Sequence, residues 1–537
     1  MISAITILMA IGLSWARLGI ALIFSIFISF CFGILAAVNK KAEHIIIPLI
    51  DVLQSIPILG FFPIAVFLLV MYFPNYGLEM AAIFLIITSQ VWNMIFAVYE
   101  SSKSIPTELI ELMKIYNMNW LQRIKRIYIP ASMPRLIANF PVSWAVGLFF
   151  LSSSEIISLG VTSYQLFGIG SLIAQIVESG QTIDLYISFG LLILILILTH
   201  SLVFNPLYSW SLKYKYEMVA MTTPVQRPWF VSTFVRATKP FRILARQVRV
   251  PRRPLSPITR PISNEQVILP IELRQPKIWE KEIRIIWLIT KLTVYSFLIL
   301  LTVYLSIVVW PAFVGALQVF TNINELVYIL YGIGISGVRI IISVIFMLPL
   351  IIVAVYVSLS KVLKQIFLPV FQILASIPAP LLFPLIVQWF GENRIEIISI
   401  VIIMLGSMWY VFYNTFSSIE ALPNELKEAC ILSGLRRLSL FRKLYLPALM
   451  PGLVTGLITA VGGAWNALIV AEWLSLGPKI YSVHEGIGKI IDEAASQGNL
   501  NLMYAALIMM VVVVVVLDRT VWRKLYDYVT THYKYEV

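Results

Sequence analysis

The chain has 537 residues, of which 59% are hydrophobic and only 12% are charged. A soluble globule cannot bury so much apolar side chain, so this composition excludes an ordinary soluble protein and predicts a helical protein that crosses the membrane several times. The formal net charge of +13 does not indicate a nucleic-acid partner, because the basic residues cluster in loops between apolar segments, as in the cytoplasmic loops of membrane proteins.

Long apolar runs predict about eleven spanning helices in two sets. The first set lies at about residues 12–38, 44–73, 79–101, 132–156 and 184–208. The second set lies at about residues 284–310, 327–358, 366–390, 395–418, 446–474 and 500–524. We therefore expect an all-α polytopic fold divided into a first repeat at 1–210, a linker at 211–283, one extra spanning helix at 284–310 and a second repeat at 311–537.

Loop charges predict the direction of these helices. Basic clusters follow the first, fifth and seventh spans, precede the fourth and tenth, and end the last one. All of these clusters fall on one side if the N-terminus is outside and both the linker and the C-terminus are cytoplasmic. The opposite loops carry acidic residues such as Glu79, Glu392 and Glu396, with fewer lysines and arginines.

The segment 211–283 is rich in arginine and proline and has no spanning run. Its basic stretches are suited to anionic lipid headgroups, which would make the segment an interfacial or regulatory arm. A solvated cytoplasmic tether explains the same composition, and we favour the tether.

The two halves repeat one sequence pattern. Three prolines of the second span recur with identical spacing in the eighth span, as Pro48, Pro57 and Pro63 in one copy and Pro369, Pro378 and Pro384 in the other. Further matches pair 105–112 with 422–429 and 154–160 with 471–477. The extra span at 284–310 restores the orientation of the second half, so we expect parallel copies related by an axis along the membrane normal, with a pathway at their interface.

A short polar segment lies between the third and fourth spans of each half. In the second half it matches the pattern E-A-A-x3-G-x9-I-x-L-P at Glu428, Ala429, Cys430, Gly434, Leu444, Leu446 and Pro447. In the first half the same frame holds Glu111, Leu112, Met113, Asn117, Ile127, Ile129 and Pro130, so both alanines and the glycine are replaced. With these motifs the chain resembles the type I permeases of ABC importers, whose inner-membrane components depend on a binding protein.

The resemblance covers both membrane halves but not the linker. The break S-I-P in the second span, the (A/S)-E-x-x-S-L-G segment after the fourth span and the G-I-G segments at 168–173 and 486–491 are most similar to the nitrate/sulfonate/taurine group. That group transports small anions and organic solutes. The resemblance therefore implies two permease halves fused in tandem.

In such permeases the polar segment is a coupling helix that docks in a groove of a separate ATPase. The resemblance assigns this ATPase-coupling role to Glu108, Glu111, Asn117, Pro130, Glu425, Glu428, Ala429, Gly434 and Pro447. The sequence itself has no G-x-x-x-x-G-K-[ST] loop for nucleotide phosphates. We therefore expect the chain not to be an enzyme and to work with two ABC ATPase subunits and an extracellular or periplasmic solute-binding protein.

The physical properties of these segments agree with a helix that lies along the membrane surface. Glu108 and Glu111 are three residues apart, as are Glu425 and Glu428, so each pair shares one helical face. Gly434 suits a left-handed helix end, where glycine costs least and asparagine is next best, so Asn117 keeps the geometry of the motif.

Charges inside the membrane predict a second group of functional residues. Arg17 pairs by repeat with Arg339, and Glu155 with Glu472, all toward the outer ends of their spans. One interpretation is a gate, or contacts from the arginines to an anionic substrate. The alternative is structural Arg–Glu pairing, which we favour over direct substrate contact.

Other pathway candidates are polar or aromatic residues within the spans. Helix breaks expose backbone polar groups and are tolerated only where protein or a cavity satisfies them. The candidates are Gln54, Ser55 and Ser376 at the breaks, with Trp144, Trp465 and Asn466 in the fourth and tenth spans.

We expect no metal site and no cofactor, because the histidines and the two cysteines show no ligand spacing. A secondary transporter that works without an ATPase is the alternative function. It would need coupling-ion sites in its spans but not the duplicated cytoplasmic motif.

Overall fold

Helices dominate the part of the chain that the computed structural model describes, which comprises residues 3–55, 58–156, 166–214, 313–420, 424–434, 437–476 and 479–532, with Trp310 and Leu422. Within this part, eight helices are long and apolar enough to cross a membrane, and one bent pair passes the same test together. The predicted all-α polytopic fold is confirmed. The count of eleven spans is not, because the span expected at 44–73 is divided and the one at 284–310 lies outside the described residues.

The first repeat begins with a helix longer than the predicted span. Its elements are α1 (Ala4–Val38), α2 (Lys40–Ser55), η1 (Ile58–Phe61), α3 (Phe62–Tyr72), α4 (Gly77–Lys103), α5 (Thr107–Ile115), α6 (Trp120–Arg123), η2 (Ile124–Tyr128), α7 (Ile129–Ile156), α8 (Ile169–Glu178), α9 (Thr182–Thr199), η3 (His200–Phe204), α10 (Asn205–Ser211) and η4 (Leu212–Tyr214).

The second repeat follows the same order. Its elements are α14 (Ile323–Met347), α15 (Pro349–Leu359), α16 (Lys361–Ala375), α17 (Ala379–Phe390), η5 (Glu392–Arg394), α18 (Ile395–Glu420), α19 (Asn424–Leu432), α20 (Arg437–Leu440), η6 (Phe441–Tyr445), α21 (Leu446–Glu472), β1 (Trp473–Leu476), β2 (Lys479–Ser482), α22 (Ile487–Ser496), α23 (Leu500–Leu517), η7 (Asp518–Trp522) and α24 (Arg523–His532).

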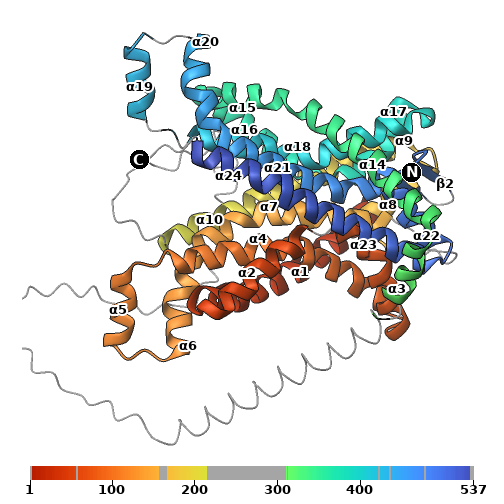
Figure 1. The fold of residues 1–537 in the computed structure, drawn as a ribbon, viewed down its shortest axis with the longest axis horizontal. Coiled ribbons are helices and arrows are strands. Elements are labelled where there is room, and N and C mark those ends of the chain that lie inside the picture. Colours follow the sequence, from red (N-terminus) through yellow and green to blue (C-terminus); the bar gives the residue numbers. More distant parts are fainter. Residues whose placement is uncertain are drawn as a thin grey trace, which may run out of the picture. The chain divides into compact units, whose positions relative to one another are not determined.

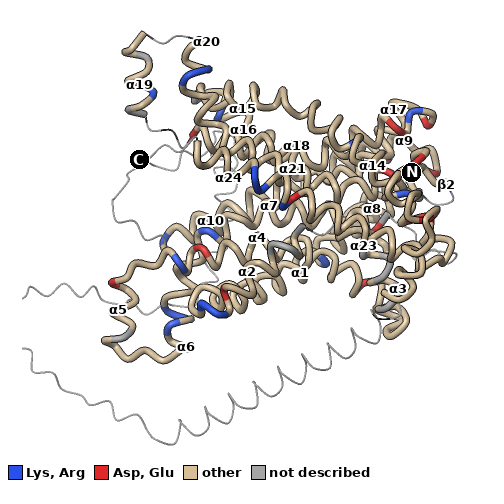
Figure 2. The backbone as a smooth tube through the Cα atoms, in the orientation of Figure 1, with Lys and Arg blue, Asp and Glu red and all other residues tan. Residues whose placement is uncertain are grey.

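The two repeats run in the same direction. Figure 1 shows α5 and α19 at one end of the helices, and α8, α22 and the strands at the other. We call these the α5/α19 end and the hairpin end. In each repeat the first, third and fourth long helices pack together, as α1, α4 and α7 in one copy and α14–α15, α18 and α21 in the other. Lysines and arginines gather toward the α5/α19 end (Figure 2), which agrees with the loop charges used to predict orientation.

Both repeats interrupt their second span at the proline motif. In the first repeat the helix stops at Ser55 and resumes through η1 and α3. In the second repeat Val362–Ala375 and Ala379–Phe390 meet at an angle of 89°. Pro378 occupies the N-cap of α17, where its missing N–H removes a donor that a helix start leaves unpaired anyway. The predicted breaks in the second and eighth spans are therefore confirmed.

A small β-hairpin was not predicted from the sequence. Strands β1 and β2 pair antiparallel, with Trp473 opposite Ser482 and Leu476 opposite Lys479. Because apolar residues resume directly after Glu472, hydropathy assigned the first residues of β1 to the span 446–474. The helix in fact ends at Glu472, whose side chain belongs to the polar network described below.

Candidate functional site

The first candidate surface is the loop that contains α5. Leu109 packs inward from α5 together with Met113, which is 2% exposed. The helix ends in a left-handed residue, Asn117, with φ of 43°. The next residue, Met118, donates its backbone N–H to the carbonyl oxygen of Met113 at 3.0 Å. This is the six-residue closure of a Schellman motif, and it pairs one of the carbonyls that a helix end leaves free.

The loop that contains α19 has the same construction. Leu426 and Cys430, at the positions of Leu109 and Met113, pack on the inner cluster of this loop. The left-handed residue is now Gly434, with φ of 78°. The predicted helix-ending conformation of Gly434 and Asn117 is thus confirmed, and the two loops are structural equivalents.

Each loop then enters its spanning helix through five residues of π-helix, η2 in the first repeat and η6 in the second. Pro130 and Pro447 lie at the second positions of α7 and α21, as expected. The carboxylate-bearing residues Glu108, Glu111 and Glu428 are exposed. The side chain of Glu425 lies outside the described ones.

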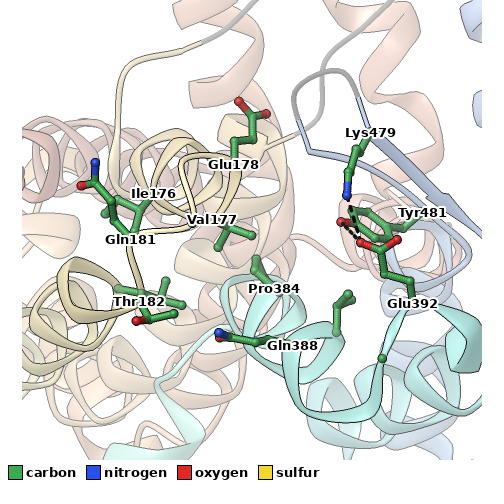
Figure 3. A pocket seen from close by; sticks show the side chains of 14 residues that line it. Ile176, Val177, Glu178, Gln181, Thr182, Pro384, Gln388, Glu392, Lys479 and Tyr481 are labelled. Atoms are coloured by element: carbon green, nitrogen blue, oxygen red, sulfur yellow. Dashed lines mark hydrogen bonds and ion pairs between the residues drawn. The ribbon is translucent and has the colours of Figure 1, made fainter.

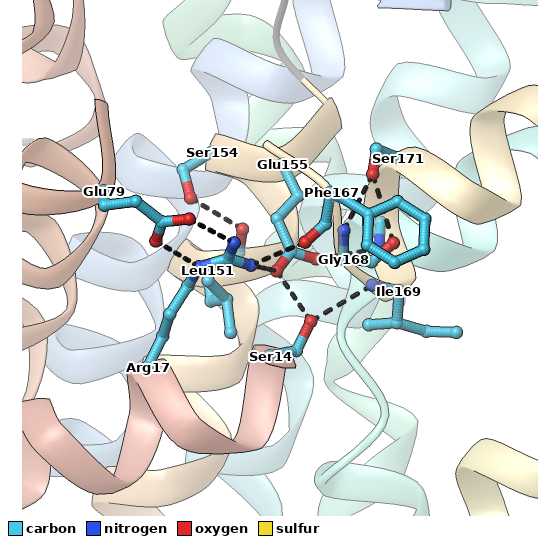
Figure 4. A network of polar contacts seen from close by, with 11 residues as sticks. Ser14, Arg17, Glu79, Leu151, Ser154, Glu155, Phe167, Gly168, Ile169 and Ser171 are labelled. Carbon is cyan, nitrogen blue, oxygen red and sulfur yellow. Dashed lines mark hydrogen bonds and ion pairs between the residues drawn. The ribbon is translucent and has the colours of Figure 1, made fainter. Parts of the chain in front are cut away.

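A polar network closes the hairpin end of the first repeat (Figure 4). Arg17 donates from Nη1 to Glu155 Oε1 at 2.8 Å and to the carbonyl oxygen of Phe167 at 3.0 Å. Its Nε and Nη2 atoms donate to the two carboxylate oxygens of Glu79, each at 2.6 Å. Ser14 donates to Glu155 Oε1 at 2.6 Å. Arg17 and Glu155 are 5% and 1% exposed, so this ion pair is buried.

The second repeat reproduces the network residue by residue. Arg339 donates to Glu472 at 2.6 Å and to Glu396 at 2.7 Å, and Nη2 also donates to the carbonyl oxygen of Glu485 at 2.6 Å. Ser336 donates to Glu472 Oε1 at 2.6 Å. The predicted Arg–Glu pairs are therefore present in both copies, with a further carboxylate in each.

The glycines of the G-I-G segments make room for the buried carboxylates. Gly170 and Gly488, at the starts of α8 and α22, donate their backbone N–H groups to Glu155 and Glu472, each at 2.8 Å. A Cβ atom added at Gly168 would lie 2.0 Å from Glu155 Oε1. Only a residue without a side chain fits there, and the helix start stabilises the negative charge.

These networks hold helices together. Each one joins the first, third and fourth long helices of its repeat to the short helix α8 or α22. The two arginines are already paired with two carboxylates each, so their charges are neutralised where they lie. The geometry supports the structural interpretation of Arg17, Arg339, Glu155 and Glu472.

Sequence reasoning missed part of this network. It counted Glu79 and Glu396 as loop acids and did not consider Ser14 and Ser336. A signal was available, because S-x-x-R occurs at the same place in both copies and the two acids recur between the same spans.

The interface where η1 of the first repeat meets α21 and α23 of the second, which we call the seam, contains one of the predicted pathway residues. Asn466 Oδ1 in α21 accepts the backbone N–H of Ile58 at 2.7 Å, so the second repeat satisfies the donor that the first repeat's helix break releases. Next to it, a Cβ atom on Gly60 would lie 2.4 Å from Leu507, so the η1 backbone packs closely on α23.

The other pathway candidates have local contacts. Ser376 donates to the carbonyl oxygen of Gln372. Trp144 packs edge-on against Trp15 and Phe204 of its own repeat, with ring centroids 6.1 and 5.7 Å away. Trp465 is 3% exposed and belongs to the main apolar cluster. The remaining candidates, Gln54 and Ser55, end α2 at the break.

A pocket of about 430 Å³ opens on the seam at the hairpin end (Figure 3). The first repeat lines it with Glu178 and Gln181 from the α8–α9 turn, and the second repeat with Gln388 of α17. Three further lining residues are joined by hydrogen bonds, since Glu392 Oε1 accepts from Lys479 Nζ at 3.1 Å and from the Tyr481 hydroxyl at 3.3 Å. Residues of both repeats therefore line the pocket.

Asp492 in α22 is an acidic residue without a counterpart in the first repeat, where Ala174 takes its place. It is 6% exposed, and its Oδ2 atom has no hydrogen-bond partner among the described residues. Burial raises the pKa of Asp492 well above its usual range, and the Glu472 carboxylate raises it further.

Removing the polar contact at the seam tests its contribution. Asn466→Leu would leave the partly buried N–H of Ile58 facing a side chain that cannot accept its hydrogen bond. Because an unpaired buried donor costs about 1–3 kcal/mol, we expect a lower thermal unfolding temperature for the purified chain. Asn414→Leu is a matched control, since the Asn414 amide donates to the Tyr410 carbonyl oxygen one turn earlier in its own helix. Equal unfolding temperatures for both variants would contradict the prediction.

Comparison with known families extends these observations. Residues 29–212 and 347–521 each match the model of the family described as binding-protein-dependent transport system inner membrane component. One match falls in each repeat, and together they cover more than half of the chain.

The chain is also similar to individual permease proteins. The chain is 29% identical to a putative aliphatic sulfonates transport permease protein of Bacillus subtilis, over 27% of this chain and 49% of the relative. It is 28% identical to a nitrate import permease protein of Leptolyngbya laminosa, over 29% and 52%. It is 30% identical to a bicarbonate transport system permease protein of Synechococcus elongatus, over 32% and 58%. The chain thus spans about half the length of the curated relatives it matches.

Proposed function

Because the chain belongs to the family of binding-protein-dependent transport system inner membrane components, we propose that it forms the solute pathway of an ATP-driven importer whose ATPase subunits are separate chains. Two copies of the family domain in one polypeptide would make a complete pair of permease halves. Two ATPase subunits and an external solute-binding protein are then the expected partners.

The observation that carries this proposal is the duplicated loop at the α5/α19 end. Both loops present a short helix that ends in a left-handed residue, at Asn117 and Gly434. Both then continue through a π-helical segment into a long helix of the same repeat. A rigid link between an exposed helix and a spanning helix suits the transmission of movement from a docked motor.

The seam between the repeats is the proposed pathway. We propose that ATP-driven closure of the ATPases moves the two repeats against each other, while the buried Arg–Glu networks keep the hairpin end of each repeat rigid. The break at Ile58, held by Asn466, and the pocket beside Gln181 and Gln388 line this seam. The N-terminus would lie outside, and the α5/α19 end and the C-terminus in the cytoplasm.

The relatives suggest the class of solute. Their printed names give sulfonates, nitrate and bicarbonate, so we propose a small anion or organic solute of the nitrate/sulfonate/taurine type. The solute-binding protein would make the selection, and the seam would provide passage.

Reconstitution tests the proposal. The chain is purified from native membranes together with the proteins that remain bound to it. It is then reconstituted in liposomes with and without these co-purified proteins. We expect an ABC ATPase to co-purify, and we expect solute uptake that needs ATP. Deleting residues 107–122 together with 424–440 should abolish both, while the spanning helices stay folded.

The alternative outcome is equally clear. Uptake by the chain alone, driven by an ion gradient and insensitive to that deletion, would contradict the proposal and identify a secondary transporter.

A further inference from the structure

The two proposed docking loops have the same interior but different exteriors. Inward positions keep their character, as Leu109 matches Leu426 and Tyr128 matches Tyr445. These residues hold each loop against its repeat. The exterior is therefore free to differ, and a comparison of exposed positions shows what each loop offers to a partner.

The exterior of the α5–α6 loop is apolar. Ile115, Tyr116 and Leu121 are 72%, 71% and 69% exposed, and Leu112 and Trp120 are 43% and 46% exposed. A patch of large exposed apolar side chains, especially one surrounded by polar residues, marks a binding surface. Leu112 and Ile115 lie on α5 with the exposed acids Glu108 and Glu111.

At two exposed positions the α19–α20 loop carries smaller side chains than the α5–α6 loop. Ala429 replaces Leu112 and Ser433 replaces Tyr116, and both are exposed. Arg437 stands in the sequence where the first loop has Trp120. Leu432, at 87% exposure, keeps the apolar character of its counterpart Ile115, and Leu438 stands in the sequence where the first loop has Leu121.

We infer that the two loops bind their ATPase subunits unequally, with the α5–α6 loop providing most of the affinity through Leu112 and Tyr116. This inference rests on the proposed function and adds to it an order of importance between the two contacts. Tyrosine and tryptophan are enriched among the residues that supply most of the energy at protein interfaces, whereas serine is under-represented there. A leucine side chain adds buried apolar area that an alanine at the same position lacks.

The construction of the first loop supports this assignment. A docking residue binds more tightly when its backbone is already fixed, because less entropy is lost on binding. Tyr116 donates its backbone N–H to Leu112 at 2.9 Å, and the following turn is closed between Met118 and Met113. Asn119 and Gln122 then form a reciprocal capping box at the start of α6. Figure 1 shows α5 and α6 standing clear of the long helices, where a soluble partner can reach them.

A conversion of one surface into the other tests the inference. The double change Leu112→Ala with Tyr116→Ser gives the first loop the residues of the second at these two positions. Leu432→Ala is the matched control on the second loop, because it removes the most exposed apolar side chain there. Both variants keep the inward residues, and their folding is checked by thermal unfolding and size-exclusion chromatography.

The measurement is the affinity of the nanodisc-embedded full chain for the ABC ATPase that co-purifies with the wild type. We expect the double change to weaken binding about tenfold or more, and Leu432→Ala to weaken it less than about twofold. Equal losses in the two variants, or a larger loss with Leu432→Ala, would overturn the inference and leave the proposed function intact. Unchanged binding in the double variant would also overturn it, since lipid or another occupant would then cover Tyr116. A wild-type chain that binds no ATPase would instead refute the proposed function.

Discussion

Replacing Glu472 with alanine is expected to destabilise the protein by about 3–5 kcal/mol, because it removes the buried one of the two carboxylates that pair with the Arg339 guanidinium. Arg339 is 4% exposed and Glu472 is fully buried. The change also removes the acceptor for Ser336 and for the backbone N–H of Gly488. We expect most of the purified variant to be aggregated, and the remainder to unfold at a much lower temperature, as measured by thermal unfolding in detergent.

The neighbouring carboxylate provides the control for this prediction. Glu396 also binds Arg339, but its side chain is 40% exposed, so Glu396→Ala should cost far less. Glu155→Ala should reproduce the large effect in the first repeat, because Glu155 is 1% exposed and binds Arg17 in the same way. A double variant, Arg339→Met with Glu472→Leu, should recover part of the loss. If Glu472→Ala unfolded at the same temperature as the wild type, the stabilising role of the polar network at the hairpin end would be refuted.

Replacing Gly434 with valine is expected to uncouple ATP hydrolysis from transport while leaving the fold intact. A Cβ atom at Gly434 would meet nothing within 4 Å, so space is not the constraint. The constraint is the backbone, since φ is 78° and a left-handed conformation costs an ordinary residue about 1–2 kcal/mol. A β-branched residue would relieve this strain by redirecting the end of α19, and with it the exposed helix that carries Glu428.

The first repeat suggests the matched control. Asn117 adopts φ of 43° at the equivalent position, so Gly434→Asn should preserve the turn and most of the activity. Solute uptake and ATP hydrolysis are measured for both variants in liposomes with the co-purified ATPase. We expect a severalfold loss of uptake per ATP hydrolysed for valine only. Equal activities for the two variants would show that the left-handed turn has no part in coupling.

Local signals in the sequence predicted a large share of this structure. Long apolar runs predicted the helices, and matched prolines predicted the breaks in the second span of each repeat, because a proline lacks the N–H that a helix interior uses and disfavours the helical conformation of the residue before it. The helix ends at Asn117 and Gly434 followed from the low cost of a left-handed backbone at these residue types. Each of these features depends on a few neighbouring residues, which a sequence displays directly.

Partners that lie far apart in the chain were decided only by the tertiary structure. Arg17 reaches Glu155 across 138 positions and Glu79 across 62, and Asn466 meets Ile58 across 408. Sequence analysis predicted the pairing of Arg17 with Glu155 because both residues recur in the second repeat. It could not identify Glu79 as a further partner of Arg17, nor Asn466 as the acceptor for the N–H that the helix break releases. A hydrogen bond requires its two atoms to lie about 3 Å apart, and that proximity arises only when the long helices pack. Periodicity and residue type determined which segments form helices here, whereas packing determined which side chains those helices bring together.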